Sequence, residues 1–191
     1  MRAFFYDGYA LMDFAFTGWH ADAAGTPMMP DREFTVRRAE DAQKSTIANL
    51  IQLYLYDMTD EGPFPVGSDG RFEYDFLDRF WQHPYLIYCD DELAGFALVI
   101  EHCPVTGLDP CWFMAEFFVL RAYRRRGLGK AAASGILQRH PGRWHVAVIE
   151  HNLRAAAFWA PTLSDYEATA IQRQFDGEDW LVREFVVETM S

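Results

Sequence analysis

The segment from Tyr123 to Leu137, YRRRGLGKAAASGIL, places cations and two glycines directly before a run of small residues typical of a helix. Gly127 and Gly129 let the backbone approach an anion closely and adopt positive φ angles. The N-terminus of the following helix presents unpaired N–H groups and a partial positive charge. Four cations lie beside the glycines, namely Arg124, Arg125, Arg126 and Lys130. The segment therefore predicts a phosphate or pyrophosphate site, the alternative being a solvated basic turn.

Two other nucleotide motifs match this segment less well. A P-loop requires GxxxxGK followed by Ser or Thr, but Arg124 and Ala131 occupy the first and last of these positions. A GxGxxG dinucleotide loop tolerates an alanine such as Ala132 at its third glycine, but the β-hairpins expected upstream do not suit a first βα unit. Nucleic acid is disfavoured because the formal net charge is −11 and the sequence pI is about 4.9.

Glu116 is the second candidate for chemistry. It is the only charged residue in WFMAEFFVL, residues 112–120. Burial in an apolar strand raises the pKa of a carboxyl group, which suits a general base near neutral pH. The alternative is that Glu116 pairs with an arginine.

The composition indicates one globular domain in a reducing compartment. Half of the 191 residues are hydrophobic, and no apolar run is long enough to cross a membrane. The three cysteines are odd in number and form no CxxC pair, so we expect reduced thiols that act as small hydrophobes. Nothing nearby in the sequence would activate Cys111, and the histidines lack metal-ligand spacing. We expect a cytoplasmic protein without metal, membrane contact or covalent acyl-enzyme.

Hydrophobic periodicity predicts the elements that position these residues. Residues 1–33 fit no pattern and are treated as an N-terminal extension of undecided structure, and residues 34–191 as a single α/β domain that mixes helices and strands. The predicted strands are 34–39, 85–89, 93–102, 112–120, 142–150, 166–175 and 180–187. The predicted helices are 40–58, 71–82, one starting near Gly129, and one from Asn152 that Pro161 stops. Turns at 90–92 and 176–179 predict two hairpins.

The motif RxxGxG at residues 124–129, between the fourth strand and a helix, resembles the coenzyme A loop of the GNAT N-acetyltransferases. The predicted order of elements from Phe34 to Val187 is similar to that fold. The resemblance implies a central mixed, mostly antiparallel sheet of about seven strands flanked by helices. It also implies transfer of an acetyl group from acetyl-CoA directly to a primary amine.

The family resemblance assigns roles to particular residues. The backbone of Phe117, Phe118 and Val119 would bond the pantetheine arm and polarise the thioester carbonyl. The loop amides would hold the pyrophosphate, and they belong to Arg125, Arg126, Gly127, Leu128, Gly129 and Lys130. In NLRAAAFW, Asn152 would bond the pantetheine arm or cap its own helix. Trp159 stands where many relatives carry a tyrosine that protonates the leaving thiolate. An indole cannot do this, so Trp159 would pack on the cofactor or donate a hydrogen bond.

The acceptor side is expected between the first two predicted helices. This segment is rich in acids and aromatics, and Asp60, Glu61 and Tyr74 are the candidate substrate contacts. We expect a small cationic amine, a peptide N-terminus or a lysine, the alternative being a solvated acidic loop. A second function class is an acyl-CoA-binding sensor or partner-binding module with little turnover, because Trp159 replaces the usual acid. The C-terminal hairpin could extend a sheet in a homodimer.

Overall fold

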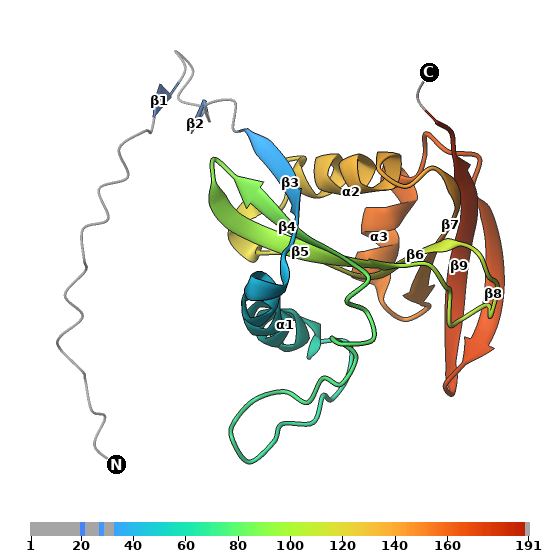
Figure 1. The fold of residues 1–191 in the computed structure, drawn as a ribbon, viewed down its shortest axis with the longest axis horizontal. Coiled ribbons are helices and arrows are strands. Elements are labelled where there is room, and N and C mark those ends of the chain that lie inside the picture. The colour runs from blue at the N-terminus through green and yellow to red at the C-terminus, as the bar shows by residue number, and fades with distance from the viewer. Residues whose placement is uncertain (1–19, 22–26, 29–32, 190–191) are drawn as a thin grey trace. The chain divides into compact units, whose positions relative to one another are not determined.

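The computed structural model describes residues 20–21, 27–28 and 33–189, and the chain divides into two units (Figure 1). In the first, Met1–Arg32, β1 (His20–Ala21) pairs antiparallel with β2 (Pro27–Met28). The second, Glu33–Ser191, contains all other elements. Most of the predicted N-terminal extension, residues 1–33, lies outside the described residues.

A seven-stranded sheet forms the centre of the second unit, with the order β3-β4-β5-β6-β7-β9-β8. Every pair of neighbours is antiparallel except β6 and β7, which are parallel. The predicted mixed, mostly antiparallel sheet is confirmed. Its strands are β3 (Phe34–Arg38), β4 (His83–Cys89), β5 (Glu92–Ile100), β6 (Trp112–Val119), β7 (Gly142–Ile149), β8 (Thr169–Phe175) and β9 (Glu178–Val187).

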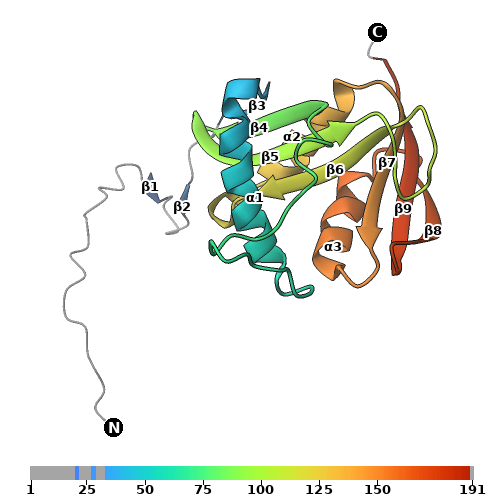
Figure 2. The ribbon, with the colours of Figure 1, turned by 60° about the horizontal axis from the view of Figure 1, so that its bottom comes forward.

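Helices cover both faces of the sheet (Figure 2). A 3-10 turn (Asp41–Gln43) leads into α1 (Lys44–Met58), which buries Ile47, Ile51 and Leu55 against the β4, β5 and β6 side chains of one face. The opposite face packs on α2 (Leu128–Gln138) and α3 (Leu153–Thr162). Each helix thus buries an apolar stripe, as the periodicity predicts. No helix in residues 20–21, 27–28 and 33–189 is long and apolar enough to span a membrane.

The strands β6 and β7 pair over only two positions and then separate. The paired residues are Trp112 with Trp144 and Phe113 with His145. Figure 2 shows the two strands diverging toward their carboxyl ends. On the β5 side, the register shifts between Leu98 and Val99, which leaves Ala115 of β6 as the extra residue of a bulge. Beyond Phe113, no described strand pairs with the second edge of β6, so its backbone groups are available to a ligand.

Both predicted hairpins are present, and their turn residues explain them. Asp90 and Asp91 have φ angles of 51° and 62°, and Asp176 and Gly177 have 51° and 78°. Two successive positive φ angles match the right-handed twist of the flanking strands, which is why such turns favour Asp and Gly.

The predicted helix over residues 71–82 is wrong. This segment is extended and then turns, with Val66 bridged to Phe72. The side-chain amide of Gln52 on α1 bonds both the N–H and the C=O of Phe72, at 2.8 and 3.1 Å. Those bonds replace the partners that a helix would have supplied. Phe72 and Tyr74 then face inward at the two-residue spacing of extended chain.

The prediction that Pro161 stops its helix is also wrong, because α3 continues to Thr162. Proline removes one backbone donor, and near the end of a helix few bonds depend on it. The Thr162 hydroxyl donates to the Phe158 carbonyl at 2.7 Å, and the Leu163 N–H donates to Trp159 at 3.0 Å. These two bonds satisfy carbonyls of the last turn.

Candidate active site

The loop between β6 and α2 forms a cradle of backbone N–H groups. Arg125 and Gly127 have φ angles of 61° and 79°, and α2 begins at Leu128. The first helical bond runs from the Ala131 N–H to the Gly127 carbonyl at 3.0 Å. The N–H groups of residues 128–130 therefore have no acceptor within the helix and point out of its N-terminal end. This end suits an anionic phosphate.

A side chain at Gly129 would be tightly packed against its neighbour. A Cβ atom there would lie 3.0 Å from the Phe158 ring of α3. The small Ala132 and Ala133 in the next turn are buried against the sheet. The cradle therefore lies close to α3 and β6.

The cations around the cradle differ in what their side chains do. The Arg124 guanidinium donates to the Val119 carbonyl at 2.7 Å and pairs with Asp57 at 2.5 Å. Lys130 pairs with Asp165 at 3.4 Å. Arg125 and Arg126 are exposed and form no ion pair with any described residue. Arg124 thus shapes the loop, whereas Arg125 and Arg126 have side chains available to an anion.

Asp57 at the end of α1 joins that helix to the loop. Arg121 and Arg124 both pair with its carboxylate. Burial raises the pKa of Asp57, but hydrogen bonds and charge from the two guanidinium groups outweigh it, so the pKa lies below its usual value.

The end of β6 offers backbone rather than side chains. Phe118 and Val119 are buried in the core, and Phe117 is half-buried. The Phe117 ring stacks on Phe158, with 5.4 Å between centroids, and meets Trp159 edge-on at 5.3 Å. These contacts fix the strand where it parts from β7. The predicted role of these three residues, through their backbone, is compatible with this placement.

Residues of α3 lie beside the same opening. The Asn152 side chain accepts a 2.9 Å hydrogen bond from the Ala155 N–H, so the capping alternative is confirmed for its oxygen. Trp159 is buried and packs on Phe117 and Phe158. It therefore supports the strand that would meet the cofactor, and it supplies no acid.

Glu116 lies on the face of β6 that α1 covers. The Tyr74 hydroxyl donates to its Oε1 at 2.9 Å, and Tyr54 of α1 donates a second hydrogen bond. Its hydrogen-bond partners are two phenols, so the alternative of an arginine pair is wrong. Burial raises the pKa of Glu116 to about 7, although both phenols act to lower it. A carboxyl group with this pKa exchanges a proton near neutral pH.

Tyr54 is the site residue that sequence analysis missed. Its spacing on α1 marks it as part of the apolar face, and its ring does pack on Phe96 and Phe118, with centroids 6.0 and 5.7 Å away. Burial and the Glu116 carboxylate raise the pKa of its phenol well above the usual range, so it stays a donor. No motif links a helical tyrosine to a strand glutamate far along the chain.

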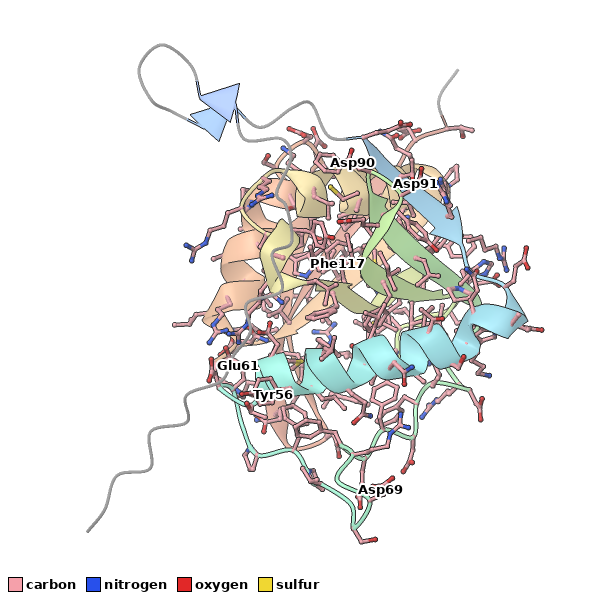
Figure 3. The ribbon with its side chains drawn as sticks, turned by 90° about the vertical axis from the view of Figure 1, so that its left-hand side faces the viewer. Tyr56, Glu61, Asp69, Asp90, Asp91 and Phe117 are labelled. Carbon is pink, nitrogen blue, oxygen red and sulfur yellow. The ribbon has the colours of Figure 1, made fainter. Side chains whose placement is uncertain are left out.

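The two other predicted substrate contacts meet an arginine. Asp60 and Glu61 both pair with Arg154 of α3, the latter at 3.8 Å. Figure 3 shows Glu61 beside Tyr56 at the end of α1, and Asp69 out on the following loop. The pairs join the acceptor-side segment to α3, and the single Arg154 offsets one of the two carboxylate charges.

A cavity of about 460 Å³ lies between α1 and residues 67–77. Gln52, Phe72, Tyr74 and Leu77 are among its walls. Tyr74 lines this cavity and also bonds Glu116, so one phenol connects the cavity with the carboxylate. The three predicted substrate contacts thus fall into two places. Tyr74 lies with Glu116, whereas Asp60 and Glu61 lie together at Arg154.

The strands β6 and β7 that separate, and the N–H cradle that follows β6, together form a candidate site for an anionic ligand with an extended arm. The acetyltransferase (GNAT) family model matches residues 50–161, more than half of the chain. The protein belongs to this family. No curated protein sequence matches it.

Solved structures share the fold at low sequence identity. A GNAT acetyltransferase from Listeria monocytogenes is 16% identical with a TM-score of 0.56, covering 81% of this chain and 95% of its own. The Salmonella typhimurium protein yncA, solved with its cofactor acetyl-CoA, is 12% identical with a TM-score of 0.54. The match covers 83% of this chain and 96% of that protein. RimL, a ribosomal L7/L12 α-N-protein acetyltransferase, is 12% identical with a TM-score of 0.55. The match covers 81% of this chain and 90% of that protein.

Proposed function

We propose that this protein transfers the acetyl group of acetyl-CoA directly to a primary amine. The observation that carries the proposal is the position of Glu116. It lies on β6, the strand that parts from β7 and leads into the phosphate cradle, and burial brings its pKa to about 7. A titratable group of matched pKa beside an anion site is a candidate for proton transfer.

Acetyl-CoA fits the residues that are present. The N-terminus of α2, with Gly127 and Gly129, has the space and the N–H groups for a pyrophosphate. The unpaired edge of β6 beyond Phe113 can bond an extended amide-containing arm. When bound, acetyl-CoA supplies an activated acetyl group whose thioester carbonyl a neutral amine can attack. A β6 N–H directed at that carbonyl oxygen would stabilise the negative charge that develops there.

Glu116 would supply the proton acceptor. Primary amines are protonated near neutral pH, because their pKa values lie near 10. Only the neutral amine carries a lone pair for attack, so the carboxylate of Glu116 takes the proton that the amine loses. Tyr54 and Tyr74 hold that carboxylate in place through their hydroxyl groups. The transfer is direct and uses no acyl-enzyme.

The acceptor is a cationic amine, either small or at a peptide N-terminus or lysine. The Glu116 carboxylate and the aromatic rings around it favour a cation. Asp60 and Glu61 contribute less to this attraction because Arg154 offsets one of their two charges.

Release of the coenzyme A thiol tests the proposal. The protein is mixed with acetyl-CoA and pooled amines: polyamines, aminoglycosides, amino acids, and peptides with free N-termini or lysines. Thiol release that depends on one pool supports the proposal and identifies the acceptor class. A higher melting temperature with acetyl-CoA but no release from any pool would instead indicate a binding module. If acetyl-CoA caused no thiol release and no rise in melting temperature, the cofactor assignment would be overturned.

A further inference from the structure

A second group of titratable side chains surrounds His145 of β7, outside the site described above. His145 is fully buried. Its Nε2 lies 2.8 Å from Oε2 of Glu184, which stands opposite it on β9 in the strand register. Burial lowers the pKa of His145, but hydrogen bonds with Cys103, Cys111 and Glu184 outweigh burial and raise the pKa to about 10.

Two thiols meet the other side of this imidazole. Cys111 Sγ lies 3.6 Å from Nδ1 of His145, and Thr106 Oγ1 lies 3.2 Å from the same atom. Cys103 forms side-chain hydrogen bonds with both His145 and Thr106. Cys103 and Cys111 come from the two ends of the loop between β5 and β6, and both are buried. The two cysteines therefore belong to one buried cluster beside His145.

The two thiols differ in their hydrogen bonds. The Cys111 S–H donates to the Leu108 carbonyl at 3.4 Å. Burial raises the pKa of the Cys103 thiol, but the hydrogen bonds from His145 and Thr106 outweigh burial, and its pKa lies below the usual value. The thiolate is the reactive form of cysteine, so Cys103 is the more nucleophilic of the two.

Both thiols are packed in a hydrophobic cluster, as the sequence predicts, but they also lie beside His145, which sequence analysis did not connect with them. The activating histidine lies far along the chain, and the pairing of Phe113 with His145 brings β7 beside the loop. Cys89 offers an internal contrast. It is buried among Ile87, Ala94, Val119 and other apolar residues of a separate cluster.

We propose that Cys103 and Cys111 are a redox-active pair, which hydrogen peroxide converts into an intramolecular disulfide. The Cys103 thiolate attacks one peroxide oxygen, the O–O bond breaks, and hydroxide leaves with a sulfenic acid formed on Cys103. The Cys111 sulfur then attacks that sulfur, the S–O bond breaks and the S–S bond forms. The proton from Cys111 and one returned by His145 convert the two hydroxide ions into water. Two sulfurs lose one electron each, and peroxide gains both.

The surroundings permit this reaction and disfavour a metal. Residues 107–110 of the covering loop are exposed and Cys111 keeps 5% of its surface exposed, so the pair lies just under the surface, within reach of a molecule as small as hydrogen peroxide. Glu184 bonds the ring nitrogen opposite the thiols, so the four side chains do not converge on one point. Among the residues that the structure describes, no group of three or more His, Cys, Asp or Glu is arranged to hold a metal ion.

Peroxide treatment of the native chain tests the proposal. Remaining thiols are blocked with an alkylating agent, and intact mass and peptide maps are then measured. The expected product has lost about 2 Da, regains it with dithiothreitol, and yields a peptide linking Cys103 to Cys111. C111S should stop at a sulfenic acid on Cys103 that dimedone traps. C89S should behave like wild type, and E184Q should oxidise several-fold more slowly because the imidazolium loses its partner.

Three results would overturn the proposal. The first is a link that includes Cys89 or joins two copies of the chain. The second is oxidation of C103S as fast as wild type. The third is a native protein that keeps all its thiols under conditions that oxidise the urea-unfolded chain. None of these results depends on acetyltransferase activity, so this inference and the proposed function fail separately.

Discussion

The Tyr74 hydroxyl donates a 2.9 Å hydrogen bond to Oε1 of Glu116, across 42 residues of sequence. The bond fixes the extended segment after α1 to the strand that leads into the phosphate cradle. Tyr54 of α1 donates a second hydrogen bond to the same carboxylate. The protonation of Glu116 therefore depends on two elements of the acceptor side.

Removing either hydroxyl should shift the pH dependence of the reaction. Both phenols lower the pKa of Glu116, so Y54F and Y74F should raise it above about 7. The rise of kcat/KM with pH should then move to higher pH in each variant. The measurement is the rate of thiol release against pH at fixed amine concentration. Y56F is the matched control, because Tyr56 lies on the same helix and is exposed. A profile for Y54F and Y74F that coincides with that of Y56F would contradict this assignment.

The strands and the phosphate cradle could be predicted because their signals are local. Alternating apolar residues, Asp-rich turns and the glycines at 127 and 129 each act on neighbouring residues. The segment 71–82 could not be predicted, since Gln52 of α1 supplies the hydrogen bonds that keep Phe72 extended.

Individual residues of the site could be predicted from the sequence, but the contacts between them in the folded protein could not. Glu116 stands out as the one charge in an apolar strand, but Tyr54 has the spacing of a core residue and no mark of its second role. Asp60 and Glu61 look like a free acidic patch until α3 brings Arg154 beside them. Cys111 looks inert until the sheet register places His145 within 3.6 Å. All three relationships depend on tertiary contacts.

Gly127 should be sensitive to substitution and Gly135 should not. Gly127 has a φ of 79°, so G127A should destabilise the fold by about 1–2 kcal/mol and raise the KM for acetyl-CoA by distorting the cradle. Gly135 lies within α2, and nothing stands within 4 Å of the position its Cβ would take. G135A should therefore stabilise the helix, by up to about 1 kcal/mol. Urea unfolding and the KM for acetyl-CoA measure both effects. Equal KM values in the two variants would show that the loop conformation does not matter for the cofactor.

Asp57 should support the cofactor loop through its two arginines. D57N removes the charge that holds Arg121 and Arg124, so the KM for acetyl-CoA should rise several-fold while kcat changes little. Because the pKa of Asp57 is lowered in the folded protein, its stabilisation is complete above about pH 4 and is lost as pH falls through the folded value. The control is D78N, which breaks the exposed pair with Lys44. An unchanged KM in D57N would show that the loop keeps its shape without this contact.

His140 should make the fold sensitive to acid. Burial and the neighbouring His83 lower the pKa of His140 to about 4, and its Nε2 is hydrogen-bonded to the Tyr85 hydroxyl at 2.6 Å. Between about pH 6.5 and 4, the unfolded chain binds a proton at this position and the folded protein does not. The stability from neutral His140 is therefore present above pH 6.5 and is lost as pH falls toward 4. Urea unfolding across this range should show a smaller loss in H140N than in wild type. H151N changes an exposed histidine and should follow wild type. Equal losses in all three proteins would remove His140 as the cause.

The central claim is that Glu116 accepts the proton of the attacking amine. The measurement is kcat/KM for amine acetylation against pH, in wild type, E116Q and the control E167Q, which changes an exposed glutamate. In wild type and E167Q, kcat/KM should rise with pH with an apparent pKa near 7. In E116Q that rise should be absent, and kcat/KM should be lower by about 10²–10⁴-fold. An E116Q enzyme that keeps both the rate and the step near pH 7 would contradict the account.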